Sequence, residues 1–321
     1  MQRDLSIDIL KFFAVIAITN SHMDVLYGEY SIMATGGAIG DALFFFASGY
    51  TLFLGQNRSF ANYYKRRINR IYPTVFTWAL ISCLFLSRQD DFLTIILHGG
   101  GWFVSCIMIY YIILFFIKKW CLKYLKIILP SLVIISMGLY WLFTDGYNFD
   151  VYGNTSYYKW IHFFTCMLLG SIMGLRSQKQ TVIVKKSWLI LIKLFVCVVL
   201  FYGFYAFKTS VEYNFIQIFS YVPLLGVSYY MYLLCNTNKI KSIYYKKIGW
   251  IMRAIGGLCL EVYIVQSCLF TDKLNMIFPL NIVIIFIEIV FVAYIVRCLS
   301  RVWAQTFKEE DYDWKSIFKV V

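Results

Sequence analysis

Runs of about 20 apolar residues recur from one end of this 321-residue chain to the other. A run of that length matches the hydrocarbon thickness of a bilayer, where the backbone must satisfy its own hydrogen bonds and is therefore helical. Charged residues make up 15% of the chain, against about 25% in soluble domains. The pattern predicts an all-α, polytopic integral membrane helix bundle. Ten transmembrane helices are expected, at roughly 7–26, 36–54, 71–87, 102–117, 126–144, 158–175, 188–207, 214–235, 248–270 and 279–299.

The basic residues alternate with nearly uncharged loops. When the N-terminus is placed in the cytoplasm, 26 of the 30 Lys and Arg fall at the inner side, and only Arg88, Lys159, Lys208 and Lys273 fall outside. This alternation follows the positive-inside rule and places both termini in the cytoplasm. The net charge of +13 is thus explained by topology, so the expected partner is the lipid bilayer and no nucleic acid is expected.

The hydrophilic stretches are too short to hold a separate soluble domain. We therefore expect one transmembrane domain over residues 1–299 and a cytoplasmic C-terminal tail over residues 300–321. The nine cysteines are scattered, without a C-x-x-C motif or a Cys/His spacing typical of zinc. Neither a disulfide framework nor a metal site is predicted.

Two ionisable residues, Lys11 and His22, interrupt the first apolar run. Eleven residues of α-helix rotate about 1100°, roughly 20° from three full turns, so both residues would share one face about 16 Å apart. His22 would lie in the outer half of the membrane, where a neutral imidazole can act as a general base on a hydroxyl. The alternative is a packed histidine hydrogen-bonded between helices.

A pair of small residues and a basic cluster follow the first apolar run. Ser48 and Gly49 in the second apolar run permit a close helix approach, which on its own indicates packing. Arg66, Arg67 and Arg70 form a basic cluster at the inner membrane surface. Such a cluster can bind phosphates, but it can equally serve as a topology anchor or contact anionic lipids.

The order of these segments resembles the acyltransferase-3 family of bacterial membrane-integral O-acyltransferases. The resemblance rests on Ile7–Lys11 leading to His22, Phe44–Tyr50, Lys65–Pro73, Gly101–Val104 and Leu260–Gln266. It implies a multi-pass protein of the bacterial inner membrane that transfers an acyl group, usually acetyl from acetyl-CoA, to a hydroxyl of a glycan or small cell-envelope acceptor. No permanently bound cofactor is expected, since acyl-CoA is a substrate.

The resemblance also implies roles for individual residues. His22 matches the essential histidine of the family, and Lys11 occupies a position where arginine is usual, which keeps the charge but loses the bidentate fork. Arg67 and Arg70 match a basic motif that serves the acyl donor. Gln266 replaces a common histidine. Ser48, Gly49, Trp102, Tyr263 and Gln266 are expected to line the site.

Glu261 lies in the ninth predicted span at a depth close to that of His22. An intramembrane carboxylate needs a partner or a proton. Pairing with His22 would orient the imidazole and stabilise its cation, as carboxylates do in acyl-transfer sites. The alternative is a structural partner for Lys11 or for a hydroxyl.

Polar and aromatic residues also gather at the predicted outer surface. We expect His98 and His162 to be interfacial. An aromatic group is interpreted as a membrane-interface belt, with a sugar-stacking surface as the alternative; its members are Tyr147, Tyr152, Tyr157, Tyr158 and Trp160.

Other classes of function remain open. A transporter or flippase for a glycan or small anion would also place Lys11, His22 and Glu261 along a path. Against it, no pair of Gly- or Pro-broken spans in corresponding halves is evident in the sequence. A scaffold would leave the buried ionisable groups unexplained. The sequence favours His22 as general base in direct transfer and leaves a transient acyl-histidine intermediate open, as it does the oligomeric state.

Overall fold

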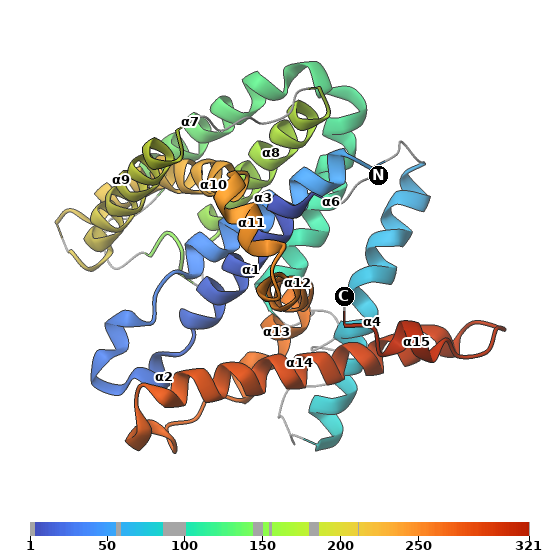
Figure 1. Cartoon of the computed structure of the whole chain (residues 1–321). Coiled ribbons are helices and arrows are strands. Elements are labelled where there is room, and N and C mark those ends of the chain that lie inside the picture. Colours follow the sequence, from blue (N-terminus) through green and yellow to red (C-terminus); the bar gives the residue numbers. More distant parts are fainter. Residues whose placement is uncertain are drawn as a thin grey trace. The chain divides into compact units, whose positions relative to one another are not determined.

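In a computed structural model of the chain, every regular element in the described part is helical (Figure 1). The structure describes residues 4–55, 59–85, 101–143, 150–153, 156–179, 186–210 and 212–320. The α-helices are α1 (Leu5–Asn20), α2 (Asp24–Tyr27), α3 (Gly37–Phe53), α4 (Phe60–Phe85), α6 (Trp102–Trp120), α7 (Leu125–Phe143), α8 (Tyr158–Lys179), α9 (Ser187–Tyr205), α10 (Tyr221–Cys235), α11 (Asn238–Tyr244), α12 (Ile248–Gly257), α13 (Cys259–Val265), α14 (Leu280–Thr306) and α15 (Trp314–Ile317). The 3₁₀ helices are η1 (Gly28–Met33), η2 (Leu122–Tyr124), η3 (Ala206–Thr209), η4 (Asn214–Ser220), η5 (Gln266–Cys268) and η6 (Asn275–Ile277).

The prediction of a multi-pass helical membrane protein is confirmed at this level. Within the described ranges, five helical stretches are long and apolar enough to cross a membrane, and two bent helix pairs would bring the number to seven. The remaining predicted spans coincide with α3, which has 17 residues, and with α4 and α8, which carry charged residues within their length.

Two of the helix boundaries that differ from the sequence prediction lie in basic segments. The basic segment Lys65–Arg70 was expected as a loop before a span that begins at residue 71, but α4 begins at Phe60 and includes it. Similarly, α14 was expected to end at residue 299 and continues to Thr306. In both cases the helix extends beyond its apolar part, because charged residues continue an α-helix readily once it leaves the hydrocarbon.

The chain divides into two compact units, each built from separate stretches of sequence. The first unit contains residues 1–14, 38–56 and 113–250, and the second contains residues 15–37, 57–112 and 251–321. In the first unit α10 packs on α9 and α8, and α7 packs on α8. In the second unit α14 packs on α4 and α13, and α13 packs on α4.

Glycines allow α3 and α8 of the first unit to approach closely. A Cβ atom added to Gly49 would lie 1.9 Å from the Met167 carbonyl oxygen, and one added to Gly170 would lie 2.0 Å from the Phe46 oxygen. Gly174, four residues after Gly170, faces the Tyr50 oxygen in the same way. The close helix approach predicted at Gly49 is therefore present, with a small-x-x-x-small pair on the partner helix.

The segment after α14 folds back onto that helix in the second unit. Arg301 Nη1 donates hydrogen bonds to the Ser316 and Ile317 carbonyl oxygens, each at 3.0 Å. Tyr294 Oη donates to the Phe318 carbonyl oxygen at 2.7 Å, and the Ile317 side chain is fully buried. This part of the predicted tail is thus docked on α14.

Candidate active site

His22 lies in a turn that follows α1. The helix ends at Asn20, and the His22 backbone N–H donates to the Thr19 oxygen at 3.1 Å. The pair formed by α1 and the following α2–η1 segment bends by 66° at this turn. Lys11 and His22 therefore do not lie on one continuous helix, and the predicted shared helix face ends before His22. Because the side chain is exposed and makes no hydrogen bond within the described residues, the packed-histidine interpretation is not supported.

Asn20 holds this turn in place. Its side-chain amide donates to the Met33 and Thr35 carbonyl oxygens, both at 2.9 Å, and its Oδ1 accepts from Tyr27 Oη at 2.6 Å. The returning chain crosses the end of α1 at Gly36, whose φ of +105° disfavours a side chain. The position of His22 is thus fixed by neighbours on both sides of the turn.

Glu261 forms a buried ion pair with Arg297 of α14. Its Oε1 accepts from Arg297 Nε at 3.2 Å and its Oε2 from Arg297 Nη2 at 2.7 Å, which is bidentate fork geometry. Thr74 Oγ1 of α4 adds a contact at 3.3 Å. Within the described residues Glu261 makes no hydrogen bond to His22. Its observed partners are a cation from another helix and a hydroxyl.

Arg297 also stabilises the second bend. The pair formed by α12 and the α13–η5 segment bends by 61°, next to Leu258, which lies just before α13. Arg297 Nη2 donates to the Gly257 carbonyl oxygen, which the bend leaves without a regular helical partner. The sequence analysis did not identify Arg297 as a site residue. The signal that could have found it is a lone cation near the inner end of the last span.

The basic cluster of α4 presents its three arginines differently. Arg66 and Arg70 are exposed. Arg67 is half-buried, with its guanidinium carbon 5.3 Å from the Tyr63 ring centroid and 5.6 Å from that of Tyr111. Two cation–π contacts of this kind hold Arg67 on the protein, which leaves Arg66 and Arg70 as the accessible cations.

Three of the expected site-lining residues belong to the second unit. The Phe103 ring, next to Trp102, lies 4.9 Å from the Tyr263 ring, and Gly101 approaches the Tyr263 hydroxyl. Gln266 is buried and its Oε1 atom has no hydrogen-bond partner in the described part of the chain. Tyr263 and Gln266 therefore share a packed region with the start of α6.

The remaining predicted site residues lie in the first unit. Lys11 is a half-buried residue of α1, and Ser48 and Gly49 are buried in α3. The surroundings of Gly49, which faces the Met167 backbone of α8, are those of helix packing.

The predicted outer region requires one correction. His162 was expected to be interfacial, but it is fully buried and stacks on Tyr221 with 3.7 Å between ring centroids. Tyr152 is half-buried beside it, whereas Tyr157 is exposed. The reason is tertiary: the segment that carries Tyr152 folds over this part of α8. His98 and Tyr147 lie outside the described residues.

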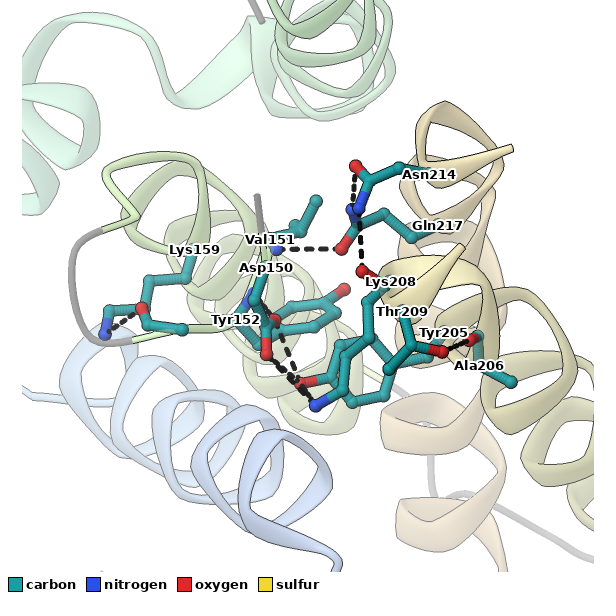
Figure 2. Close-up of polar contacts among 11 residues, drawn as sticks. Asp150, Val151, Tyr152, Lys159, Tyr205, Ala206, Lys208, Thr209, Asn214 and Gln217 are labelled. Carbon is teal, nitrogen blue, oxygen red and sulfur yellow. Dashed lines mark hydrogen bonds and ion pairs between the residues drawn. The ribbon is translucent and has the colours of Figure 1, made fainter. Parts of the chain in front are cut away.

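Polar contacts fasten that segment to the end of α9 (Figure 2). The Asp150 carboxylate accepts from Tyr205 Oη at 2.9 Å and from Lys208 Nζ at 3.0 Å. The Val151 N–H donates to Gln217 Oε1 at 2.9 Å. The first unit thus has an ordered polar region that sequence analysis did not anticipate.

These observations define a multi-pass helical protein with an accessible histidine after its first helix and a basic segment on α4. A family model described as an acyltransferase domain matches residues 4–298. The chain belongs to the acyltransferase-3 family, as the resemblance predicted. No curated protein and no solved structure matches the chain.

Proposed function

We propose that this acyltransferase moves an acyl group, specifically acetyl, from acyl-CoA to a hydroxyl of a glycan or another cell-envelope acceptor. Membership of the family supports acyl transfer in general. The observation that carries the finer proposal is His22, a histidine at the family's histidine position that is exposed and held in a defined turn.

In this mechanism His22 acts as general base. Its neutral imidazole accepts the proton of the acceptor hydroxyl while that oxygen attacks the thioester carbonyl carbon. A carbon–oxygen bond forms, the carbon–sulfur bond breaks, and the imidazolium returns the proton to the leaving CoA thiolate. In the alternative, His22 itself attacks the thioester and a transient acyl-histidine transfers the acyl group in a second step.

The donor is proposed to bind from the cytoplasmic side. Arg66 and Arg70 would contact the CoA phosphates, with Arg67 beside them in its aromatic stack and Lys11 further along the path of the pantetheine arm. Exposed guanidinium groups suit this role, because they bind phosphate through paired hydrogen bonds. A catalytic role is also proposed for Glu261, whose carboxylate is held in place by its buried ion pair with Arg297.

The finer topology belongs to the same proposal. Ten spans, both termini in the cytoplasm, placement in the bacterial inner membrane and a tail from residue 300 would put the basic cluster of α4 on the side where CoA is made. The alternation of basic and uncharged segments supports this arrangement.

The test measures release of free CoA from acetyl-CoA by purified protein in nanodiscs with candidate hydroxyl acceptors. His22→Ala should abolish CoA release while expression and insertion stay normal, because alanine inserts into a membrane more easily than histidine. Glu29→Ala, an exposed residue in the same loop region, is the matched control and should retain activity. Wild-type activity in His22→Ala would rule out the proposed base.

A transporter for a glycan or small anion remains the second candidate, because of the two bent helix pairs. No such breaks were expected from the sequence, and discontinuous helices occur at substrate sites of transporters. Uptake of a labelled acceptor into proteoliposomes without acyl-CoA would favour transport. Uptake that is absent, together with acceptor-dependent CoA release, would favour transfer.

A further inference from the structure

The chain between two candidate membrane spans, residues 236–247, forms a short connection. The stretch Asn214–Cys235, which joins η4 and α10, is long and apolar enough to cross a membrane, and the bent pair of α12 and the α13–η5 segment begins at Ile248. A connection this short between two spans stays at the membrane surface, within reach of lipid headgroups. The mechanism proposed above uses no residue of this connection.

Buried contacts fix one side of the connection to the first unit. The Tyr244 side chain, at the end of α11, is buried, and its hydroxyl donates a hydrogen bond to the Asp8 carboxylate of α1 at 3.0 Å. α11 therefore lies beside α1 (Figure 1). Lys241 Nζ of α11 donates to the Oδ1 atom of Asn236, which precedes the helix, at 3.0 Å. These contacts hold α11 in a fixed orientation.

A tight turn joins α11 to α12. The Lys246 N–H donates to the Ile243 carbonyl oxygen at 3.1 Å, and the Gly249 N–H donates to the Lys246 carbonyl oxygen at 2.9 Å. A Cβ atom added to Gly249 would lie 1.6 Å from the Tyr244 carbonyl oxygen, so the turn closes on the end of α11 at this glycine. Tyr244 and Gly249 are buried, whereas residues 245–248 between them are exposed. The turn therefore presents these side chains away from the protein.

The exposed surface of α11 and the turn is strongly basic. Lys239, Lys246 and Lys247 are exposed, and within the described residues their ammonium groups make no hydrogen bond or ion pair. No acidic residue occurs between Glu212 and Glu261 in the sequence, so no neighbour along the chain balances these charges. The surface is complementary in charge to an anionic partner.

Aromatic and aliphatic side chains accompany the lysines. Tyr245 is 76% exposed and Trp250 is 57% exposed, and Ile243 and Ile248 are also exposed. Tyrosine and tryptophan rings favour the boundary between lipid headgroups and acyl chains. A segment that combines such rings with lysines binds an anionic membrane surface through both kinds of group. The lysines and the rings therefore point to the same partner.

We propose that Lys239, Lys246 and Lys247, with Tyr245 and Trp250, form a docking surface for the headgroups of anionic phospholipids. The ammonium groups contact the lipid phosphates, while the two rings lie where the headgroups meet the acyl chains. Phosphatidylcholine carries the same phosphate without a net negative charge, so it binds this surface more weakly.

A role in topology alone does not account for this construction. Membrane orientation depends on the number of Lys and Arg in a short loop, and a loop without fixed geometry would serve equally well. Here a buried tyrosine, a packed glycine and backbone hydrogen bonds hold the lysines close to two exposed rings. Such an arrangement contributes to contact with a headgroup, because less side-chain and backbone ordering is needed when the lipid binds.

The experiment measures how brominated lipids quench the fluorescence of Trp250 in the full chain. The protein is placed in phosphatidylcholine nanodiscs that contain an equal mole fraction of either brominated phosphatidylcholine or brominated phosphatidylglycerol. The difference between the wild type and Trp250→Phe isolates the Trp250 signal. Brominated phosphatidylglycerol should quench Trp250 more than brominated phosphatidylcholine does, and high salt should reduce this excess quenching because it screens the attraction. The readout is lipid contact, so it does not depend on acyl transfer.

Lys246→Gln/Lys247→Gln removes two charges from the turn. The affinity for phosphatidylglycerol, taken from the mole fraction that gives half of the excess quenching, should fall about 10- to 30-fold. Lys246→Arg/Lys247→Arg keeps both charges and should keep the excess quenching. The matched control is Lys308→Gln/Lys315→Gln, which removes two charges from exposed lysines on either side of the acidic residues 309–311. This control should also keep the excess quenching.

Three results would overturn the proposal. Both brominated lipids could quench Trp250 equally, the excess quenching could survive in Lys246→Gln/Lys247→Gln, or the control variant could lose it to the same extent, which would make it an effect of net charge. Acetyl-CoA affinity is measured in the same nanodiscs and should not change in Lys246→Gln/Lys247→Gln. A fall in acetyl-CoA affinity with the excess quenching intact would assign these lysines to the donor phosphates instead.

The unfolding temperature of each variant in phosphatidylcholine alone should equal that of the wild type, because only exposed side chains are changed. If Lys246→Gln/Lys247→Gln fails to fold, Lys239→Gln/Lys247→Gln decides the outcome. It also removes two of the three lysine charges and should lose the excess quenching.

Discussion

The Glu261–Arg297 pair allows a sharp test of the second unit. Replacing Arg297 with methionine keeps a long side chain on α14 and removes both hydrogen bonds to the Glu261 carboxylate, at 3.2 and 2.7 Å. Glu261 would keep only the Thr74 hydroxyl at 3.3 Å. Because the Glu261 side chain is 5% exposed, water cannot replace the lost donors.

The expected loss follows from these contacts. Hydrogen bonds to charged groups contribute about 1.5–3 kcal/mol each, and removing one partner of a buried ion pair costs about 3–5 kcal/mol. We expect Arg297→Met to lower the free energy of unfolding by about 3–5 kcal/mol. Thr74→Val, which removes only the long third contact, should cost about 0.5–1.5 kcal/mol.

Lys208→Met provides the matched control. It breaks the ion pair with Asp150, which has a similar length of 3.0 Å but side chains that are 35% and 33% exposed. An exposed pair contributes about 0–1 kcal/mol. Arg297→Met should therefore lower the free energy of unfolding several-fold more than Lys208→Met does. Reversible unfolding in mixed detergent micelles, followed by tryptophan fluorescence, measures the difference.

Equal losses in Arg297→Met and Lys208→Met would refute the reasoning, since burial would then not determine the strength of these pairs. If Arg297→Met lowers the free energy of unfolding by less than about 1 kcal/mol, the Glu261–Arg297 pair contributes no more than an exposed salt bridge does. The double variant Glu261→Gln/Arg297→Met should recover part of the stability, because no unpaired charge remains buried.

Three further predictions concern packing, donor binding and the C-terminal segment. Gly49→Ala should destabilise the chain by about 1–3 kcal/mol through overpacking, whereas Gly138→Ala, with nothing within 4 Å of its added Cβ, should be neutral or stabilising in the same unfolding assay. Arg70→Ala should weaken acetyl-CoA binding in nanodiscs roughly 10- to 150-fold with acceptor affinity unchanged; an unaltered donor affinity would leave the cluster as a topology anchor. Arg301→Ala should raise hydrogen exchange at the amides around residues 313–318, which exposed Lys315→Ala should not do, and equal exchange in both variants would contradict the docked segment.

The sequence by itself determined the helical class and much of the element order. Apolar runs of bilayer length admit only helices, because a backbone in lipid must pair its own groups. The motif order around His22 and Arg70 was sufficient to predict the family. The close approach at Gly49 was also predictable, since a glycine in an apolar helix leaves room for a backbone.

Only the tertiary structure decided how polar residues are partnered. Glu261 meets Arg297, 36 residues away, because α13 and α14 pack together, and no local pattern encodes that contact. The bend that takes His22 out of the helix depends on Asn20 bonding to chain 13 and 15 residues further on. His162 is buried partly because the ring of Tyr221, the first residue of α10, stacks on it. The hydropathy of each segment determines where a helix forms. The partner of each buried polar side chain depends on long-range packing of helices, which the spacing of residues in the sequence does not specify.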